Sequence, residues 1–259
     1  ELSKDFMKDY KLIKTMSDED LNPDITEFAT IARENEKLET LIGFLDVQNP
    51  NLAIVFGRTK RRVDELSSAL IAKGYLAEGL HGDITQSKRL EILRKFKNNS
   101  LQILVATDVA ARGIDISDVT HVYNFDIPQD TESYTHRIGR TGRAGKSGVA
   151  VTFLNPIEMP YLKDIEVSRG ERMKMLRPYT SDEVKKARYN RMFEEVISEL
   201  DNNHVEFNSL ANKLMAEANA EKIITVLLSK LINDKKDVDV ELSFEKPLPR
   251  KQEKSRRSG

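Results

Sequence analysis

The decapeptide HRIGRTGRAG, residues 136–145, concentrates three arginines, one histidine and three glycines in a short stretch. Arg137, Arg140 and Arg143 recur at every third position, so Arg140 and Arg143 can present neighbouring guanidinium groups to one target. Glycine lets the backbone approach closely, and paired guanidinium groups suit an anion with several oxygens, such as a phosphate chain. The alternative interpretation of such a short basic run is a solvated surface.

Three further basic loops follow short apolar runs: FGRTKRR (56–62), HGDITQSKR (81–89) and ATDVAARGIDI (106–116). Arg89 lies near the first turn of a predicted helix, where a cation opposes the helix dipole and a bound phosphate would remove the conflict. The Thr107 hydroxyl and the amides after it can hold a phosphate, and Asp115 can accept hydrogen bonds from ribose hydroxyls. Each loop taken alone is also consistent with an ordinary strand-to-helix turn.

The elements that must position these loops alternate between apolar runs and amphipathic segments from about residue 50 to 170. Apolar runs of this length are typical of strands buried on both faces, and they predict a parallel α/β sheet with helices on both faces. In such a sheet, ligands bind at the carboxyl ends of the strands. The five predicted strands are 52–56, 75–82, 101–108, 119–126 and 147–154.

From Ser181 onward the pattern changes to helices without buried strands, at 181–201, 209–220 and 220–234. The last of these is apolar almost all round and must be covered, which predicts a subunit partner because some 65 residues form a marginal core alone. Residues 237–247 alternate apolar and polar side chains, which predicts a strand with one buried face. The basic end of the chain, 246–259, has no apolar periodicity and is predicted to be disordered.

Composition excludes several classes of protein. The chain has 41 Lys+Arg against 42 Asp+Glu, so any nucleic-acid site must be a local arrangement of cations. Cysteine is absent, which excludes disulfides and thiolate metal sites and fits a reducing cytoplasm. No apolar run approaches the ~20 residues of a membrane span, so no membrane partner is predicted. There is no GxxxxGK[ST] phosphate loop, and the acidic run at 18–20 follows no strand, so no metal site is predicted in this chain.

Five segments resemble, in order and separation, the motif set of the second RecA-like domain of DEAD-box RNA helicases: FGRTKRRVDEL, HGDITQSKR, TDVAARGIDI, VYNFDIPQD and YTHRIGRTGRAG. The resemblance covers about residues 30–165, and His136, where related helicases usually have glutamine, favours the DEAD-box group. It implies a RecA-like domain at 31–178. It also implies that residues 1–30 are the remnant of a first RecA-like domain and a linker, so that the chain is a fragment.

The resemblance implies a role for each site residue. Arg140 and Arg143 correspond to catalytic arginine fingers that reach the γ-phosphate of ATP, and Asp115 corresponds to the residue that contacts the ATP ribose. ATP and its Mg²⁺ would be held mainly by a first RecA-like domain in cis. The positions matching RNA-backbone contacts are Arg58, Gly82, Arg89 and Thr107, and those matching interdomain contacts are Gln86, Arg112, His136 and Arg137.

Residues 179–245 are similar to the helical dimerisation domain of bacterial cold-shock DEAD-box helicases, in which ELSFEKPL recurs in similar form. The resemblance implies a cytoplasmic homodimer with roles in RNA decay, an RNA-degradation complex and cold adaptation. The full-length protein would be an RNA-stimulated ATPase that unwinds short RNA duplexes, whereas this chain alone would be inactive. The alternative is a non-catalytic, dimeric RNA-binding scaffold. The missing phosphate loop favours the scaffold, and the paired arginines beside a ribose-binding acid argue against it.

Overall fold

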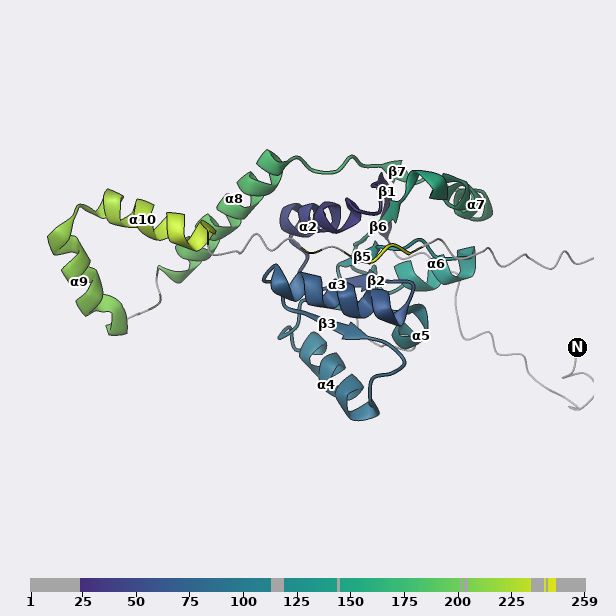
Figure 1. Ribbon diagram of the computed structural model, residues 1–259, viewed down its shortest axis with the longest axis horizontal. Coiled ribbons are helices and arrows are strands. Elements are labelled where there is room, and N and C mark those ends of the chain that lie inside the picture. Colours follow the sequence, from purple (N-terminus) through teal and green to yellow (C-terminus); the bar gives the residue numbers. More distant parts are fainter. Residues whose placement is uncertain are drawn as a thin grey trace, which may run out of the picture.

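The computed structural model describes residues 24–112, 119–143, 145–200, 202, 205–233, 240 and 242–245. Within these residues, seven parallel strands form one sheet in the order β3-β4-β2-β5-β6-β1-β7 (Figure 1). The five strands predicted from apolar runs are all present, as β2 to β6. The strands are β1 (Ile25–Ile31), β2 (Ala53–Phe56), β3 (Ala77–Leu80), β4 (Ile103–Ala106), β5 (His121–Asn124), β6 (Gly148–Leu154) and β7 (Lys174–Met175).

Strand β1 was not predicted, and it places the start of the sheet before the boundary expected at residue 31. It pairs with β6 along its whole length, from Ile25 beside Gly148 to Ile31 beside Leu154. Its other neighbour, β7, is only two residues long, so most of β1 lies at the sheet edge, where polar side chains are tolerated. Residues 1–23, where the remnant and linker are expected, lie outside the described residues.

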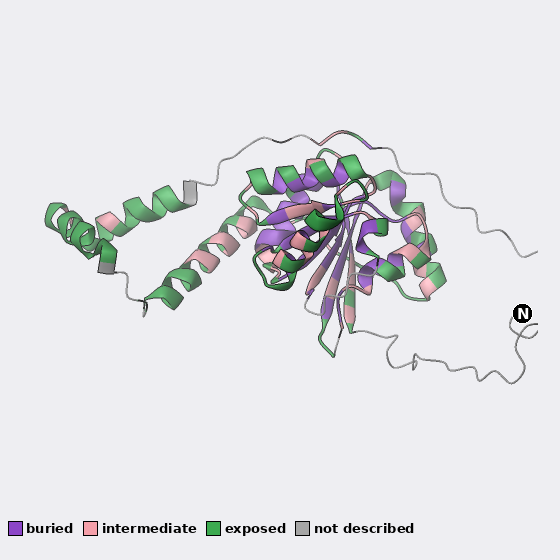
Figure 2. Cartoon of the chain, turned by 90° about the horizontal axis from the view of Figure 1, so that it is seen from below, coloured by how far each residue is buried: buried purple, intermediate pink, exposed green. Residues whose placement is uncertain are grey.

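Helices cover both faces of the sheet, as predicted. Helices α2 (Lys37–Gln48) and α3 (Lys60–Ala72) pack on one face, against alternate strand residues such as Val55 and Val105. The intervening residues point to the other face and pack against α4 (Gln86–Lys97), α5 (Asp108–Ala111), α6 (Thr131–Ile138) and α7 (Met159–Arg169). The buried side chains therefore concentrate in the α/β part of the chain (Figure 2).

The C-terminal helices α8 (Ser181–Glu199), α9 (Asn208–Glu217) and α10 (Ala220–Asn233) extend away from the sheet (Figure 1). The first half of α8 is fastened to α2, since Arg188 and Arg191 both pair with the buried carboxylate of Asp46. Beyond that junction no described side chain of these helices is buried. Within the described residues, no helix is both long and apolar enough to cross a membrane.

The strand predicted at 237–247 is not formed by the residues described there, Val240 and Leu242–Glu245. The expected alternation of burial is partly present, because Val240 and Leu242 pack against the core beneath α2 and α3. The backbone amide of Ser243, however, donates to the Glu65 side chain instead of to a neighbouring strand. At this point a hydrogen bond to a side chain takes the place of the strand-to-strand backbone hydrogen bonds that were expected.

Candidate functional site

Four loops that leave neighbouring strands lie side by side at the carboxyl edge of the sheet. Backbone hydrogen bonds connect each strand end to the next: Thr107 N to Leu80 O at 3.2 Å, Gly57 N to Ala106 O at 3.1 Å, and Asp126 N to Phe56 O at 3.2 Å. The strand order β3-β4-β2-β5 therefore brings together three basic loops that are far apart in sequence, with the loop after β5 beside them.

Arg137 fastens α6 to this edge. Its Nε and Nη2 donate to the two carboxylate oxygens of Asp108, at 2.5 and 2.9 Å, and its Nη1 donates to the Asp126 carbonyl at 2.6 Å. The guanidinium also lies 5.0 Å from the centre of the Phe56 ring, and the side chain is only 2% exposed. The interdomain contact predicted for Arg137 does not fit this burial, because its donors are directed into its own domain. Its geometry makes it a positioning residue.

A cavity of about 300 Å³ lies beside Arg137, between α5 and α6. Its lining includes Arg112, His136 and Arg140, three of the residues singled out from sequence, together with Phe56 and Asp108. His136 and Arg112 are exposed, whereas Arg140 is half-buried. Because Arg137 lines it as well, the cavity brings together three guanidinium groups and an imidazole contributed by two separate motifs.

The side chains of Arg140 and Arg143 are each held by a backbone carbonyl four residues earlier in the chain. The Nε of Arg140 donates to the His136 carbonyl at 3.1 Å, and the Nε of Arg143 donates to the Gly139 carbonyl at 2.8 Å. Burial and the neighbouring charge of Arg143 lower the pKa of the Arg140 guanidinium from its ordinary value. An oxyanion placed beside both groups would relieve this repulsion, as expected for a phosphate site.

The loop that carries these arginines is packed tightly against β6. The buried Thr141 hydroxyl donates to the Val119 carbonyl at 2.6 Å. A Cβ atom at Gly148 would lie 2.5 Å from the Thr141 hydroxyl oxygen and 2.7 Å from the Gly142 nitrogen, so only glycine permits this contact. The loop is thereby held in one place relative to the sheet.

The four residues predicted to contact an RNA backbone do not share one environment. The Arg58 side chain is only 5% exposed, and its Nη2 donates to Glu158 at 3.1 Å. Its main-chain amide donates to Asp126 at 2.9 Å. A buried carboxylate thus holds the Arg58 guanidinium inside the domain, and the RNA contact assigned to Arg58 stays a prediction.

Gly82, Arg89 and Thr107 remain accessible. Among the described residues, a Cβ at Gly82 would meet only the Lys60 side chain, at 3.6 Å, so none of them requires glycine there. A ligand approaching the backbone from outside would account for it. The Thr107 side chain makes no capping hydrogen bond to α5, and Arg89 donates to the Ala110 carbonyl at 2.7 Å. That bond connects α4 to α5, the short helix that follows β4.

Gln86 is the first residue of α4 and is exposed, but it does not line the cavity that contains Arg140. Asp115 lies in the segment 113–118, outside the described residues, so the ribose contact assigned to it stays a prediction. Among the described residues, no cluster of three or more His, Asp or Glu side chains is placed to hold a metal ion.

Sequence reasoning missed a buried ionic cluster beneath the FGRTK loop. Arg62 is completely buried, contacts Glu34 and lies 3.6 Å from Asp126. Lys37 is 3.4 Å from Glu158. The signal was present, since Arg62 precedes the buried Leu66 by four residues and so lies on the core stripe of α3. The cluster comprises Glu34, Lys37, Arg58, Arg62, Asp126, Glu158 and Glu245.

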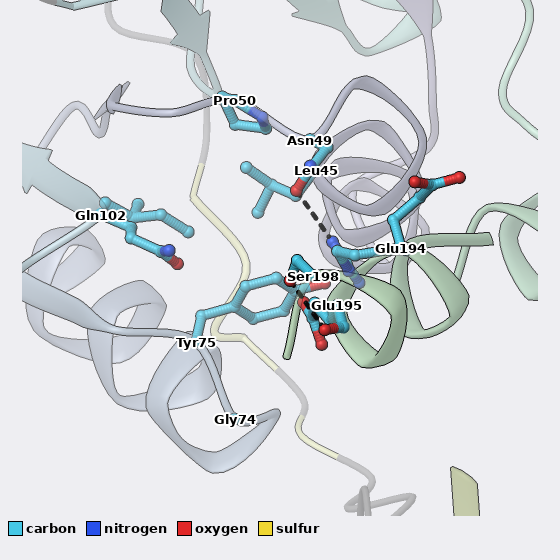
Figure 3. Close-up of a pocket in the computed structure, with 11 residues that line it drawn as sticks. Leu45, Asn49, Pro50, Gly74, Tyr75, Gln102, Glu194, Glu195 and Ser198 are labelled. Atoms are coloured by element: carbon cyan, nitrogen blue, oxygen red, sulfur yellow. Dashed lines mark hydrogen bonds between the residues drawn. The ribbon is translucent and has the colours of Figure 1, made fainter. Parts of the chain in front are cut away.

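A larger cavity, of about 670 Å³, lies at the opposite edge of the sheet (Figure 3). Its walls are loop residues that precede the strands, including Pro50, Tyr75 and Gln102, and one side of α8 that includes Glu194. None of the residues predicted to do chemistry lines it. Size alone is therefore a poor guide to the site in this molecule.

Comparison with known proteins agrees with this geometry. Residues 36–145 match the helicase conserved C-terminal domain family. The chain is 48% identical over 252 residues to the DEAD-box ATP-dependent RNA helicase CshA of Geobacillus kaustophilus (strain HTA426), covering 97% of this chain and 54% of that protein. It thus spans about half the length of this curated relative.

Two solved structures extend the comparison. One is the E. coli DEAD-box protein SrmB bound to the regulator of ribonuclease activity A, with 37% identity and a TM-score of 0.57 over 62% of this chain and 93% of that chain. The other is S. cerevisiae Dbp5 bound to RNA and ADP BeF3, with 29% identity and a TM-score of 0.62 over 72% of this chain and 51% of that chain. The chain belongs to the DEAD-box helicase family, and its parallel sheet is the RecA-like C-terminal domain of that family.

Proposed function

We propose that this chain is the C-terminal part of an ATP-dependent RNA helicase that unwinds or remodels short RNA duplexes. ATP would be hydrolysed at the interface between this RecA-like domain and another one in cis. The observation that carries the proposal is the grouping of Arg140, His136 and Arg112 around one cavity at the carboxyl edge of the sheet, with Arg143 beside Arg140.

Arg140 and Arg143 serve as the two arginine fingers in this proposal. ATP and its Mg²⁺ are held mainly by the other domain, and the two guanidinium groups approach the γ-phosphate when the domains close. An arginine finger accelerates phosphoryl transfer by about 10³–10⁵, or roughly 4–7 kcal/mol of barrier. The hydrogen bonds from each Nε to the backbone support this role, because a positioned cation needs little reorganisation during the reaction. Asp115 is proposed to contact the ATP ribose.

RNA is proposed to run along the loops after β3 and β4. Gly82, Arg89 and Thr107 would contact the sugar-phosphate backbone, so binding would be independent of sequence. Arg58 would act indirectly, by holding its loop through the pair with Glu158. The residues proposed to meet the other RecA-like domain are Gln86, Arg112 and His136. Arg137 is proposed to hold α6 beside α5 through its bonds to Asp108 and to the Asp126 carbonyl.

The helical module, Ser181–Asn233, is proposed to form a homodimer. Its described side chains leave large apolar groups exposed, among them Phe193, Leu227 and Leu231. A cytoplasmic location, roles in RNA decay and cold adaptation, and membership of an RNA-degradation complex belong to the same proposal and are supported only by the family resemblance.

Substitution of Arg140 tests the catalytic proposal. In the full-length protein, Arg140→Ala is expected to lower the RNA-stimulated kcat for ATP hydrolysis by about 10³ or more. Binding of single-stranded RNA should change little, because Arg140 faces the cavity and not the β3–β4 loops. Arg94→Ala, at an exposed position late in α4, is the matched control. A decrease of less than about tenfold for Arg140→Ala would contradict the role assigned here.

A non-catalytic, dimeric RNA-binding scaffold is the competing proposal, and the absence of a GxxxxGK[ST] sequence from these 259 residues favours it. The reading frame upstream of Glu1 separates the two. An upstream phosphate loop and an Asp-Glu-Ala-Asp sequence would support the enzyme, whereas their absence from the gene would contradict the helicase proposal.

A further inference from the structure

A short C-terminal segment returns to the RecA-like domain after the helical module. Its described residues, Val240 and Leu242–Glu245, lie along α3 and are named the strap (the short yellow stretch beside α3 in Figure 1). Leu242 packs against the core beneath α3. The amide and hydroxyl of Ser243 donate to the Glu65 carboxylate, the amide at 3.1 Å and the hydroxyl at 2.6 and 2.7 Å. The strap is thus fastened by both apolar and polar contacts.

The strap ends with Glu245 at the N-terminus of α3. The Glu245 carboxylate accepts a hydrogen bond from the Thr59 hydroxyl, which caps the helix. Its oxygens lie 3.8 Å from Arg61 Nη2 and 3.9 Å from Arg62 Nε, and its side chain is only 7% exposed. A helix N-terminus with two guanidinium groups is a suitable place for an anion, and here the anion comes from the same chain.

Glu245 fits this place imperfectly. Its Oε2 is buried and makes no hydrogen bond to the described residues, and neither do Nε and Nη1 of the completely buried Arg62. Buried donors and acceptors without a hydrogen bond are costly. A phosphate group has more acceptor oxygens than a carboxylate, so it could bond the Thr59 hydroxyl and both guanidinium groups at once.

This site lies next to the loops at the carboxyl edge of the sheet. Thr59 follows the loop after β2, and the adjacent Lys60 forms an ion pair with Asp83, next to Gly82 in the loop after β3. The cations around Glu245 therefore continue the row of loops proposed to face RNA. This proximity favours an RNA phosphate as the competing anion.

We propose that Thr59, Arg61 and Arg62 form a phosphate site that Glu245 occupies as an internal anion, and that a phosphate of bound RNA displaces it. The strap then lowers the affinity of the protein for RNA, and RNA binding releases the end of the strap from α3. The choice of RNA as the source of the phosphate rests on the function proposed above. The existence of the site does not.

RNA binding by the 259-residue chain tests the proposal, with fluorescence anisotropy of a labelled short oligouridylate at low salt. Glu245→Gln keeps the size and an acceptor for Thr59 but removes the charge, so it should bind RNA about three- to tenfold more tightly. Phe244→Ala, at an exposed position of the same strap, should bind as the original chain does. Adding Arg61→Gln to Glu245→Gln should cancel the gain in RNA affinity, because the RNA phosphate that replaces Glu245 would bind the Arg61 guanidinium.

Ser243→Ala gives a second route to the same result, because it loosens the strap without altering the phosphate site. It should also tighten RNA binding, though less than Glu245→Gln. Thermal unfolding followed by circular dichroism verifies that each variant is folded. An affinity for RNA that is unchanged or weaker in both folded variants overturns the role assigned to RNA.

Inorganic phosphate separates this inference from the proposed function. If Glu245→Gln frees an anion site, added phosphate should raise its unfolding midpoint more than that of the original chain. If no form binds RNA while phosphate still protects the variant selectively, the proposed function and the RNA source are both wrong, but the site is supported. Equal responses to phosphate, together with equal RNA affinities, overturn the site itself.

Discussion

Phe153 and Phe193 are the same residue type in two regions of one chain, with opposite surroundings. Phe153, in β6, is completely buried and its ring lies 5.6 Å from that of Phe44 and 6.2 Å from that of Phe125. Phe193, in α8, is 62% exposed. Most large apolar residues of the sheet domain are buried within the chain, whereas those described in the helical module are largely exposed.

The helices of the two regions show why they differ. In α3 the apolar residues Val63, Leu66 and Leu70 lie on one stripe and are buried against the sheet. In α10 the apolar residues follow one another almost continuously, and Ile224, Leu227 and Leu231 are exposed. Helix α10 also has one side that is more apolar than the rest, but among the described residues nothing buries it. The module thus needs contacts that the described part of one chain does not supply.

The largest expected effect contrasts these two phenylalanines directly. Phe153→Ala should lower the free energy of unfolding of the α/β domain by about 3–5 kcal/mol, through lost burial and a new cavity. Phe193→Ala should change it by no more than about 0.5 kcal/mol, because the ring is already in solvent. Urea denaturation followed by circular dichroism measures both. Similar losses for the two variants would show that α8 belongs to the same cooperative core.

The next prediction concerns association through the helical module. The chain is expected to be a dimer at tens of micromolar by sedimentation velocity, since extensive shared apolar surface would hold the two copies together. Leu227→Glu combined with Leu231→Glu should weaken the dimer at least tenfold, about 1.4 kcal/mol or more. Val167→Glu, at an exposed position of α7, is the control and should leave the dimer intact. A monomeric mass for the chain without substitutions would contradict the proposed homodimer.

The two regions also differ in how much the sequence could predict. The strands β2 to β6 follow from short apolar runs, because a strand buried on both faces needs apolar residues throughout. Strand β1 escaped detection because Thr26, Glu27 and Thr30 interrupt its apolar residues, and because its pairing with β6 joins segments more than 100 residues apart. Helix bounds in the C-terminal module were predicted well by periodicity, but periodicity does not say what covers a helix.

The candidate site shows the same limit. The resemblance assigned Arg140 to the γ-phosphate and Arg112 and His136 to the interdomain contact, and the cavity between α5 and α6 brings these three residues together. The resemblance assigned Arg58 to an RNA contact and Arg137 to an interdomain contact, and in the structure both guanidinium groups are buried. Their carboxylate partners, at Glu158 and Asp108, are 100 and 29 residues away in sequence. Burial of a charge depends on such distant partners, which local pattern does not reveal.

A smaller effect is expected at the junction between the two regions. The Asp46 carboxylate is fully buried and accepts from Arg188 Nε at 2.6 Å and from Arg191 Nη2 at 3.0 Å. Asp46→Asn keeps the volume but removes the charge that both guanidinium groups share. The free energy that holds α8 against α2 should decrease by about 1–3 kcal/mol. This decrease should show as faster hydrogen exchange in the first half of α8, with little change in the sheet.

Glu183 provides the matched control, because it is an exposed carboxylate that pairs with an arginine at the start of the same helix. Hydrogen bonds from Arg177 and Thr180 lower its pKa from 4.5 to about 2. Its contribution is therefore complete above about pH 4.5 and is lost as the pH falls toward 2. Glu183→Gln should leave the docking of α8 nearly unchanged at neutral pH, since an exposed pair is screened by solvent. If it loosened α8 as much as Asp46→Asn does, the buried pairs with Asp46 could not be what fastens the helical module to the sheet domain.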